Sequence, residues 1–100
     1  MVLDNPRKSP MTIKTGSYVG DGGDDVQIAT GFKCSFVIIT RDDATKAACM
    51  FSNKCLNILD ASQLTGGSGL HATDGFTVYN TGDIINVTDK TYKYWAIATA

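Results

Sequence analysis

The sequence contains no glutamate, and all ten of its acidic residues are aspartate. Glutamate favours helix interiors, whereas aspartate competes with the backbone for hydrogen bonds and favours turns and caps. The chain has only two prolines, but it has ten glycines and is rich in threonine. Threonine is enriched in strands and glycine in turns. The composition therefore excludes a mainly helical protein and predicts strands joined by turns.

Long hydrophobic runs are also missing. The longest aliphatic runs are Phe36–Ile39 and Trp95–Ala98, and a membrane-spanning helix needs about 20 apolar residues. The N-terminus, "MVLDNPRKSP", has no apolar segment after its basic residues, so we expect no secretory signal. The formal net charge is −1, and the basic residues are scattered. We therefore expect neither a membrane nor a nucleic acid as partner.

The usual signatures of catalysis are absent. His71 is the only histidine, and no strained nucleophile turn accompanies it. The glycines of "TGGSG" (65–69) lack the lysine and hydroxyl residue of a phosphate-binding loop. Paired aspartates fall in turns, where they are normally structural. We therefore expect that the protein is not an enzyme, that it binds no cofactor, and that it has neither catalytic nor cofactor-binding residues.

The chain has three cysteines, Cys34, Cys49 and Cys55, which are too few for a disulfide framework. Cys49 and Cys55 have no histidine nearby, and the turn "DGGDD" lacks the ligand pattern of a calcium loop, so we expect no metal site. The three cysteines are predicted to be buried or half-buried free thiols; an intermolecular disulfide stays open.

Alternating and apolar segments predict the strands. They are "MTIKTGSYVG" (11–20), "VQIAT" (26–30), "GFKCSFVIITRDD" (31–43), "GFTVY" (75–79), "DIINV" (83–87) and "TYKYWAIAT" (91–99). The 31–43 segment is continuous in β-branched residues and is expected in the middle of a sheet. The closely spaced strands at the end predict a meander. The fold class is all-β, an antiparallel β-sandwich with a meander in its C-terminal half.

The segment Ala44–Leu64 has two interpretations. Ala48, Phe51, Cys55 and Leu59 fall close to helical spacing. Read as strands, "KAACMF" and "CLNIL" form a hairpin that turns at "SNK". Asparagine and serine are poor residues for the middle of a helix, so we favour the hairpin.

The last predicted strand carries the only tryptophan. Alternation places Tyr92 and Tyr94 on one face and Lys93, Trp95 and Ile97 on the other. Trp95 is either part of a stacking platform for a sugar or base, or part of the core. Apolar neighbours flank it, so we predict that Trp95 is buried.

Residues 1–10 are predicted to form an extended N-terminal arm, and residues 11–100 the β-sandwich domain. The arm is either a disordered tail or a segment that lies on a neighbouring subunit. Pro6 and Pro10 lack amide donors, and no strand or helix periodicity appears before Met11. The arm offers four candidate partner-binding residues. They are Val2, Leu3, Arg7 and Lys8.

Three stretches occur in the same order as in small β-sandwich modules of tailed-bacteriophage virions: "IKTGSYVGDGGDDVQIATGFKCSFVIIT", "DGFTV" and "TYKYWAIA". The chain resembles these modules from Thr12 to Ala98. It differs from them at Lys33-Cys34-Ser35, where a proline is common, and in its cysteines. The resemblance implies a structural virion protein, assembled in the host cytoplasm, that interacts with other proteins as an oligomer.

The resemblance leaves the position on the virion open. Tail-fibre modules are usually pieces of longer chains, so a free-standing chain of 100 residues is expected to be a capsid decoration or head-stabilising protein. Its partners would be the major capsid protein and copies of itself. The alternative is a tail-fibre or receptor-binding module that recognises a carbohydrate on the host surface.

Overall fold

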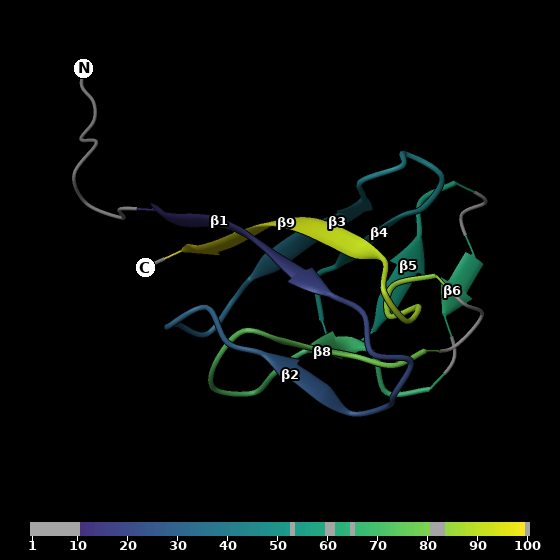
Figure 1. The fold of residues 1–100 in the computed structure, drawn as a ribbon. Helices are drawn as coiled ribbons and strands as arrows, with labels where there is room; N and C mark the ends of the chain where they lie inside the picture. The colour runs from purple at the N-terminus through teal and green to yellow at the C-terminus, as the bar shows by residue number, and fades with distance from the viewer. Residues whose placement is uncertain (1–10, 53, 60–61, 65, 81–83, 100) are drawn as a thin grey trace, which may run out of the picture.

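The computed structural model describes residues 11–52, 54–59, 62–64, 66–80 and 84–99. These residues form strands and turns, and none of them lies in a helix (Figure 1). The strands are β1 (Met11–Val19), β2 (Val26–Ile28), β3 (Phe36–Arg41), β4 (Ala47–Met50), β5 (Cys55–Asn57), β6 (Ser62–Leu64), β7 (Gly69–Leu70), β8 (Phe76–Val78) and β9 (Thr91–Thr99). The all-β prediction is confirmed.

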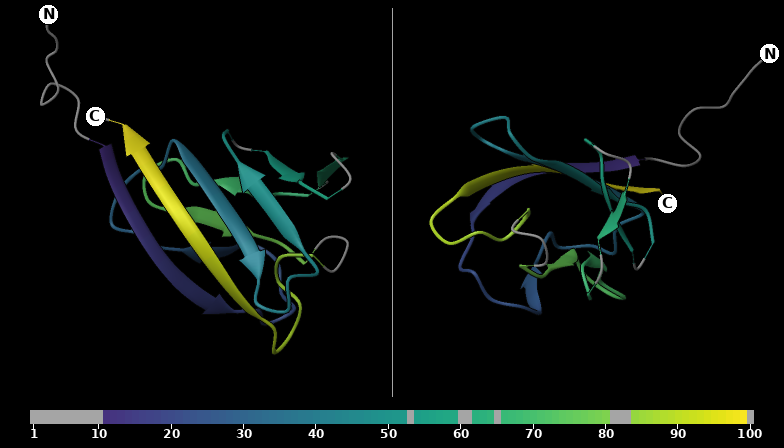
Figure 2. Two further views of the ribbon diagram at one scale, coloured as in Figure 1. Left: turned by 90° about the horizontal axis from the view of Figure 1, so that it is seen from above. Right: turned by 90° about the vertical axis from the view of Figure 1, so that its right-hand side faces the viewer.

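The strands make two antiparallel sheets. The larger sheet has six strands in the order β1-β9-β3-β4-β5-β6, and the smaller has the order β2-β8-β7. In Figure 2 the long strands β1 and β9 lie side by side, and the smaller sheet forms a second layer beneath them. The 31–43 segment supplies β3, which lies between β9 and β4 as predicted for an interior strand.

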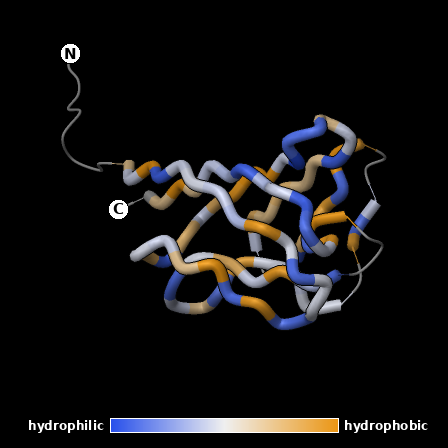
Figure 3. Tube along the Cα trace, in the orientation of Figure 1, coloured by the Kyte–Doolittle hydropathy of each residue, from blue (hydrophilic) through white to orange (hydrophobic). Residues whose placement is uncertain are grey.

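The core lies between the two layers. Every second residue of the six-stranded sheet faces inward, so that Val37, Ile39, Tyr92 and Ala96 are fully buried. Phe76 and Val78 of β8 meet them from the other sheet. Figure 3 shows hydrophobic residues along the strands of both sheets and hydrophilic residues in most of the turns between them.

Four aromatic rings pack together between the layers. Tyr18 of β1 stacks on Tyr92 of β9, with ring centroids 5.1 Å apart. Phe76 of β8 meets the Tyr18 ring edge-on at 6.0 Å and the Tyr94 ring at 5.2 Å. Such pairs add to the stabilisation that burial provides. Burial raises the pKa of Tyr18, and the neighbouring Tyr92 raises it further, so the Tyr18 hydroxyl stays neutral.

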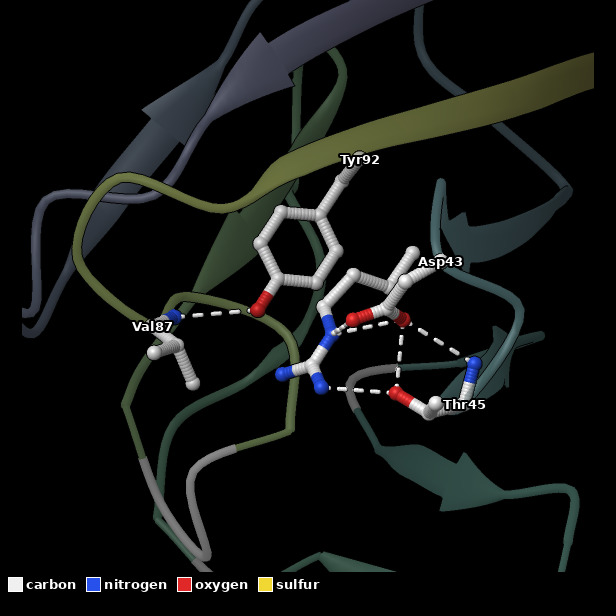
Figure 4. A network of polar contacts seen from close by, with 5 residues as sticks. Asp43, Thr45, Val87 and Tyr92 are labelled. Atoms are coloured by element: carbon white, nitrogen blue, oxygen red, sulfur yellow. Dashed lines mark hydrogen bonds and ion pairs between the residues drawn. The ribbon is translucent and has the colours of Figure 1, made fainter.

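The strand predicted at 83–87 is not present in the part that the structure describes, Ile84–Val87. Ile84, Ile85 and Asn86 are all buried, whereas a strand at the surface of a layer buries alternate residues. Tyrosine hydroxyls replace a strand partner here. The Tyr18 hydroxyl donates to the Ile85 carbonyl at 2.7 Å. The Val87 amide donates to the Tyr92 hydroxyl at 3.0 Å (Figure 4).

The prediction that the C-terminal half forms a meander is therefore wrong, because the consecutive paired strands lie earlier in the chain. The consecutive strands β3, β4, β5 and β6 are neighbours in the larger sheet. The C-terminal half instead divides its strands: β7 and β8 pair in the smaller sheet, and β9 inserts between β1 and β3. The long strand β9 finds a partner of equal length in β1, with a continuous register from Met11↔Thr99 to Val19↔Thr91.

The hairpin interpretation of Ala44–Leu64 is confirmed. Strands β4 and β5 pair in the register Ala48↔Asn57, Cys49↔Leu56 and Met50↔Cys55. Met50 and Cys55 face the core and are buried, while Cys49 and Leu56 lie on the opposite face and are half-buried. This period of two is what a strand needs, and the helical spacing was a coincidence of a short apolar segment.

Candidate functional site

The face of the six-stranded sheet that points away from the core is the most distinctive surface of the described residues. Directly paired residues in antiparallel strands share a face, so the registers place one residue of every strand in a single row across the sheet. That row consists of Thr15, Trp95, Ile38, Cys49, Leu56 and Gln63. The smaller sheet lies against the opposite face, and we call the surface with this row the outer face.

Trp95 lies on the outer face and is 41% exposed. The prediction that it is buried is therefore wrong. Alternation along β9 separated Tyr94 and Ala96 from Trp95 correctly, but those two residues face the second sheet and fill the core. The second sheet packs against the side of β9 that carries Tyr94 and Ala96, and Trp95 points away from it. In the register Trp95 pairs with a polar residue, Thr15 on β1, which agrees with its exposure.

An open groove of about 420 Å³ lies beside Trp95. It is lined by Thr15, Gly16, Ser17, Lys93, Tyr94 and Trp95. Gly16 leaves room for the Tyr94 ring, because a Cβ atom at this position would collide with it. The groove combines an aromatic face, two hydroxyls and a cationic amine. This set can stack on an apolar ring face and donate hydrogen bonds to oxygen atoms around it.

A second hollow lies at the other end of the outer face. It has a volume of about 160 Å³ and is lined by Phe51, Ser52, Lys54, Cys55, Leu56 and Gln63. Phe51 is 61% exposed and Ile58 is 44% exposed. The register of β4 and β5 extends to place Ile58 opposite Ala47, on the same face as Leu56. We call Phe51, Leu56 and Ile58 the β4–β5 patch. Exposed apolar residues gathered in this way are typical of protein-binding surfaces.

No family model, no curated protein and no solved structure matches this chain. None of the described residues belongs to a helix long and apolar enough to cross a membrane.

The turn between β3 and β4 holds the ion pair shown in Figure 4. The Arg41 Nε donates to the Asp43 carboxylate at 3.0 Å, and the Arg41 Nη2 donates to the Thr45 hydroxyl at 2.6 Å. The Thr45 amide also donates to Asp43. The hydrogen bond from Arg41 holds the pKa of Asp43 well below its usual range, and the bond to Asp43 raises the pKa of Arg41. These groups satisfy one another, so the network shapes the turn.

His71 follows β7 in a loop. Its Nδ1 accepts hydrogen bonds from the Thr73 and Asp74 amides, both at 3.2 Å. The histidine thereby closes the turn that leads into β8. These hydrogen bonds stabilise the turn.

The cysteines are free thiols, as predicted: Cys34 and Cys55 are buried and Cys49 is half-buried. Burial raises the pKa of Cys55 to about 12, and the neighbouring Cys49 adds to this. Among the residues that the structure describes, no three histidine, cysteine or acidic side chains gather in a way that could hold a metal ion.

The predicted partner-binding residues of the arm lie outside the described residues. They are Val2, Leu3, Arg7 and Lys8. The structure instead brings together residues that sequence reasoning did not combine, above all the β4–β5 patch and the Trp95 groove. Alternation indicates the face of each residue, but the patch depends on the pairing of β4, β5 and β6, which only the fold determines.

Proposed function

We propose that this chain is a structural virion protein of a tailed bacteriophage that binds the outer capsid surface and stabilises the head. The sequence resemblance supports the virion assignment. The observation that carries the docking role is the β4–β5 patch, an exposed apolar surface on a rigid sheet. In this proposal its partner is the major capsid protein, and the binding involves no catalysis.

Docking would use the patch in two ways. Phe51 projects from the sheet as an apolar anchor for a pocket on the capsid subunit, and the adjacent hollow receives an apolar side chain in return. Burying one phenylalanine contributes about 2 kcal/mol, which is too little for stable binding by itself. Several copies on a symmetric shell multiply such contacts through their high local concentration.

The test compares the binding of two variants to purified capsids that lack the protein. Phe51→Ser removes the anchor, and we expect a loss of affinity of about 10-fold or more. Gln27→Ser is the control, because Gln27 is exposed on β2 of the smaller sheet, in the layer opposite the patch. Wild-type occupancy for Phe51→Ser would contradict docking through the patch.

The Trp95 groove favours a second function, recognition of a host-surface carbohydrate in a tail-fibre or receptor-binding module. An exposed indole flanked by the Thr15 and Ser17 hydroxyls suits a sugar ring, whose apolar face stacks while its hydroxyls bond outward. Trp95 is the only tryptophan, so its fluorescence reports this site alone. A saturable change on titration with host-surface oligosaccharides, lost in Thr15→Val with Ser17→Ala, would support this function over capsid binding.

A further inference from the structure

Strand β1 forms one edge of the six-stranded sheet and is nine residues long. Its inner side pairs with β9 along its full length. Just beyond β1, the Gly20 amide donates to the Lys90 carbonyl and the Gly20 carbonyl accepts from the Asp89 amide. Hydrogen bonding alternates along an antiparallel strand. The even-numbered residues of β1 therefore bond to β9, and the odd-numbered residues direct their amides and carbonyls outward.

This outward edge has few of the features that keep edge strands from pairing. Natural edges carry prolines, several charges or bulges, or are very short. Strand β1 contains no proline, Lys14 is its only charged residue, and its register with β9 has no bulge. Among the described residues, no strand pairs with this side of β1. Its row of backbone donors and acceptors is a template for another strand.

The side chains of β1 also lack cover. Met11, Ile13 and Val19 are 56%, 60% and 62% exposed. They make up three of the seven large hydrophobic residues that are exposed in the described part of the chain. All three are odd-numbered, so they belong to the residues whose backbone groups face outward. A partner that bonds to this edge covers these apolar side chains in the same step.

We propose that a second copy of this chain pairs with β1 through its own β1, in the antiparallel direction and with Thr15 on the two-fold axis. An antiparallel edge pair is self-complementary, as a two-fold interface requires. Only the Thr15-centred register uses the whole strand: it places Met11 opposite Val19 of the second copy and Ile13 opposite Ser17 of the second copy. The outward groups then form about ten hydrogen bonds.

The side chains fit this register. The two apolar ends of each strand, Met11 and Val19, meet each other across the interface at both ends. Lys14 lies opposite Gly16 of the second copy, so that like charges are not directly paired. The two sheets become one continuous sheet, with the Trp95 groove and the β4–β5 patch still exposed. A single strand pair covers less area than a standard interface of about 1,600 Å², so the dimer dissociates on dilution.

The first experiment measures the mass of the purified protein by sedimentation velocity over a range of concentrations. We expect the average mass to rise with protein concentration from that of the monomer towards that of the dimer, which is twice as large. Thr15→Pro removes the outward amide at the axis without touching the bonds to β9, since edge positions accept proline. We expect this variant to stay monomeric with an unchanged far-ultraviolet circular dichroism spectrum. Thr15→Val keeps the amide and is expected to dimerise as the wild type does.

The second experiment needs no variant and follows amide hydrogen exchange of the wild-type protein. The amides of Ile13, Thr15 and Ser17 are expected to be protected at high concentration and to exchange quickly on dilution. If these amides are protected in a monomer at every concentration, another part of the same chain covers the edge. That result would overturn the proposal. A monomer with fast exchange at every concentration would overturn it as well. Both experiments use the protein alone, so their outcome is independent of capsid binding.

Discussion

Trp95 shows how alternation along one strand separates a buried face from an exposed face. Its neighbours Tyr94 and Ala96 face the core, while Trp95 itself is 41% exposed beside the Thr15 and Ser17 hydroxyls. The sequence contained the alternation but could not indicate which face a second layer would cover. Since both faces of β9 carry aromatic residues, hydrophobicity alone favoured the wrong side. The polar residues of the partner strand were the better guide.

The exposure of Trp95 predicts its fluorescence. In the native protein we expect emission at the long wavelengths of a solvent-exposed indole, with efficient quenching by iodide, because the positive charge of Lys93 in the same groove attracts the anion. A Lys93→Gln variant is the control, and its quenching by iodide is expected to be weaker while quenching by neutral acrylamide is unchanged. Blue-shifted emission that resists both quenchers would show that the groove is closed.

Asp74 is predicted to make stability depend on pH. Its carboxylate accepts hydrogen bonds from the Gly31 amide at 2.8 Å and the Thr30 amide at 3.0 Å. The bond from Gly31, with that from Thr30, lowers the pKa of Asp74, and His71 contributes as well. A pKa lowered in the folded state gives stability that is fully present above the unfolded pKa of about 4 and is lost as the pH falls through the folded pKa.

The variant Asp74→Asn keeps an oxygen acceptor but cannot be titrated, so its free energy of unfolding is expected to fall less steeply than that of the wild type between about pH 4 and pH 2. Urea unfolding at several pH values measures this slope. Asp42→Asn is the control, since the Asp42 carboxylate makes no hydrogen bond among the described residues. Equal slopes for Asp74→Asn and the wild type would show that Asp74 is not perturbed in solution.

At the scale of elements, the sequence predicted most strands because their pattern is local. Alternation located β1 and β9, the β-branched run located β3, and the poor helix propensity of asparagine and serine favoured the β4–β5 hairpin. Ile84–Val87 could not be predicted in this way. Its backbone is held by two tyrosine hydroxyls. Tyr18 is distant in sequence from Ile85, and Tyr92 lies across a turn from Val87. Such contacts exist only once the two sheets have packed.

The Tyr18 hydroxyl is therefore expected to stabilise the 84–87 segment. Tyr18→Phe leaves the Ile85 carbonyl without its donor in a buried position, which costs about 1–2 kcal/mol of the free energy of unfolding. Tyr94→Phe is the matched control, because the Tyr94 hydroxyl has no hydrogen-bond partner among the described residues, and its effect is expected to stay below about 0.5 kcal/mol. Urea unfolding followed by far-ultraviolet circular dichroism measures both. Equal stabilities for the two variants would contradict the anchoring role.

At the scale of the whole molecule, the two layers have different structural roles. The smaller sheet covers one face of the larger sheet and completes the core, and the outer face remains available with a groove at the β1–β9 end and an apolar patch at the β4–β5 end. The edge of β1 adds a surface for a second copy. Sequence patterns predicted the all-β fold, but not the outer face, because that face depends on the pairing of β1 and β9, which are distant in sequence, with the consecutive strands β3 to β6.

The N-terminal arm adds a prediction at this scale. Val2 and Leu3 are expected to bury against a neighbouring subunit, which contributes on the order of 3 kcal/mol per copy before the cost of ordering the segment. Deletion of residues 1–10 is expected to lower capsid occupancy and the heat resistance of the particle, while the circular dichroism spectrum of the free protein stays unchanged. Equal occupancy and heat resistance with and without the arm would show that it is not a tether.

The central claim is that the β4–β5 patch on the outer face binds the capsid. Hydrogen–deuterium exchange of the protein bound to capsids, compared with the free protein at equal concentration, tests it most directly. The account predicts slower exchange on binding in residues 47–59, with little change in β7 and β8 on the opposite layer. Slower exchange confined to β7 and β8, or no difference between bound and free protein in residues 47–59, would contradict it.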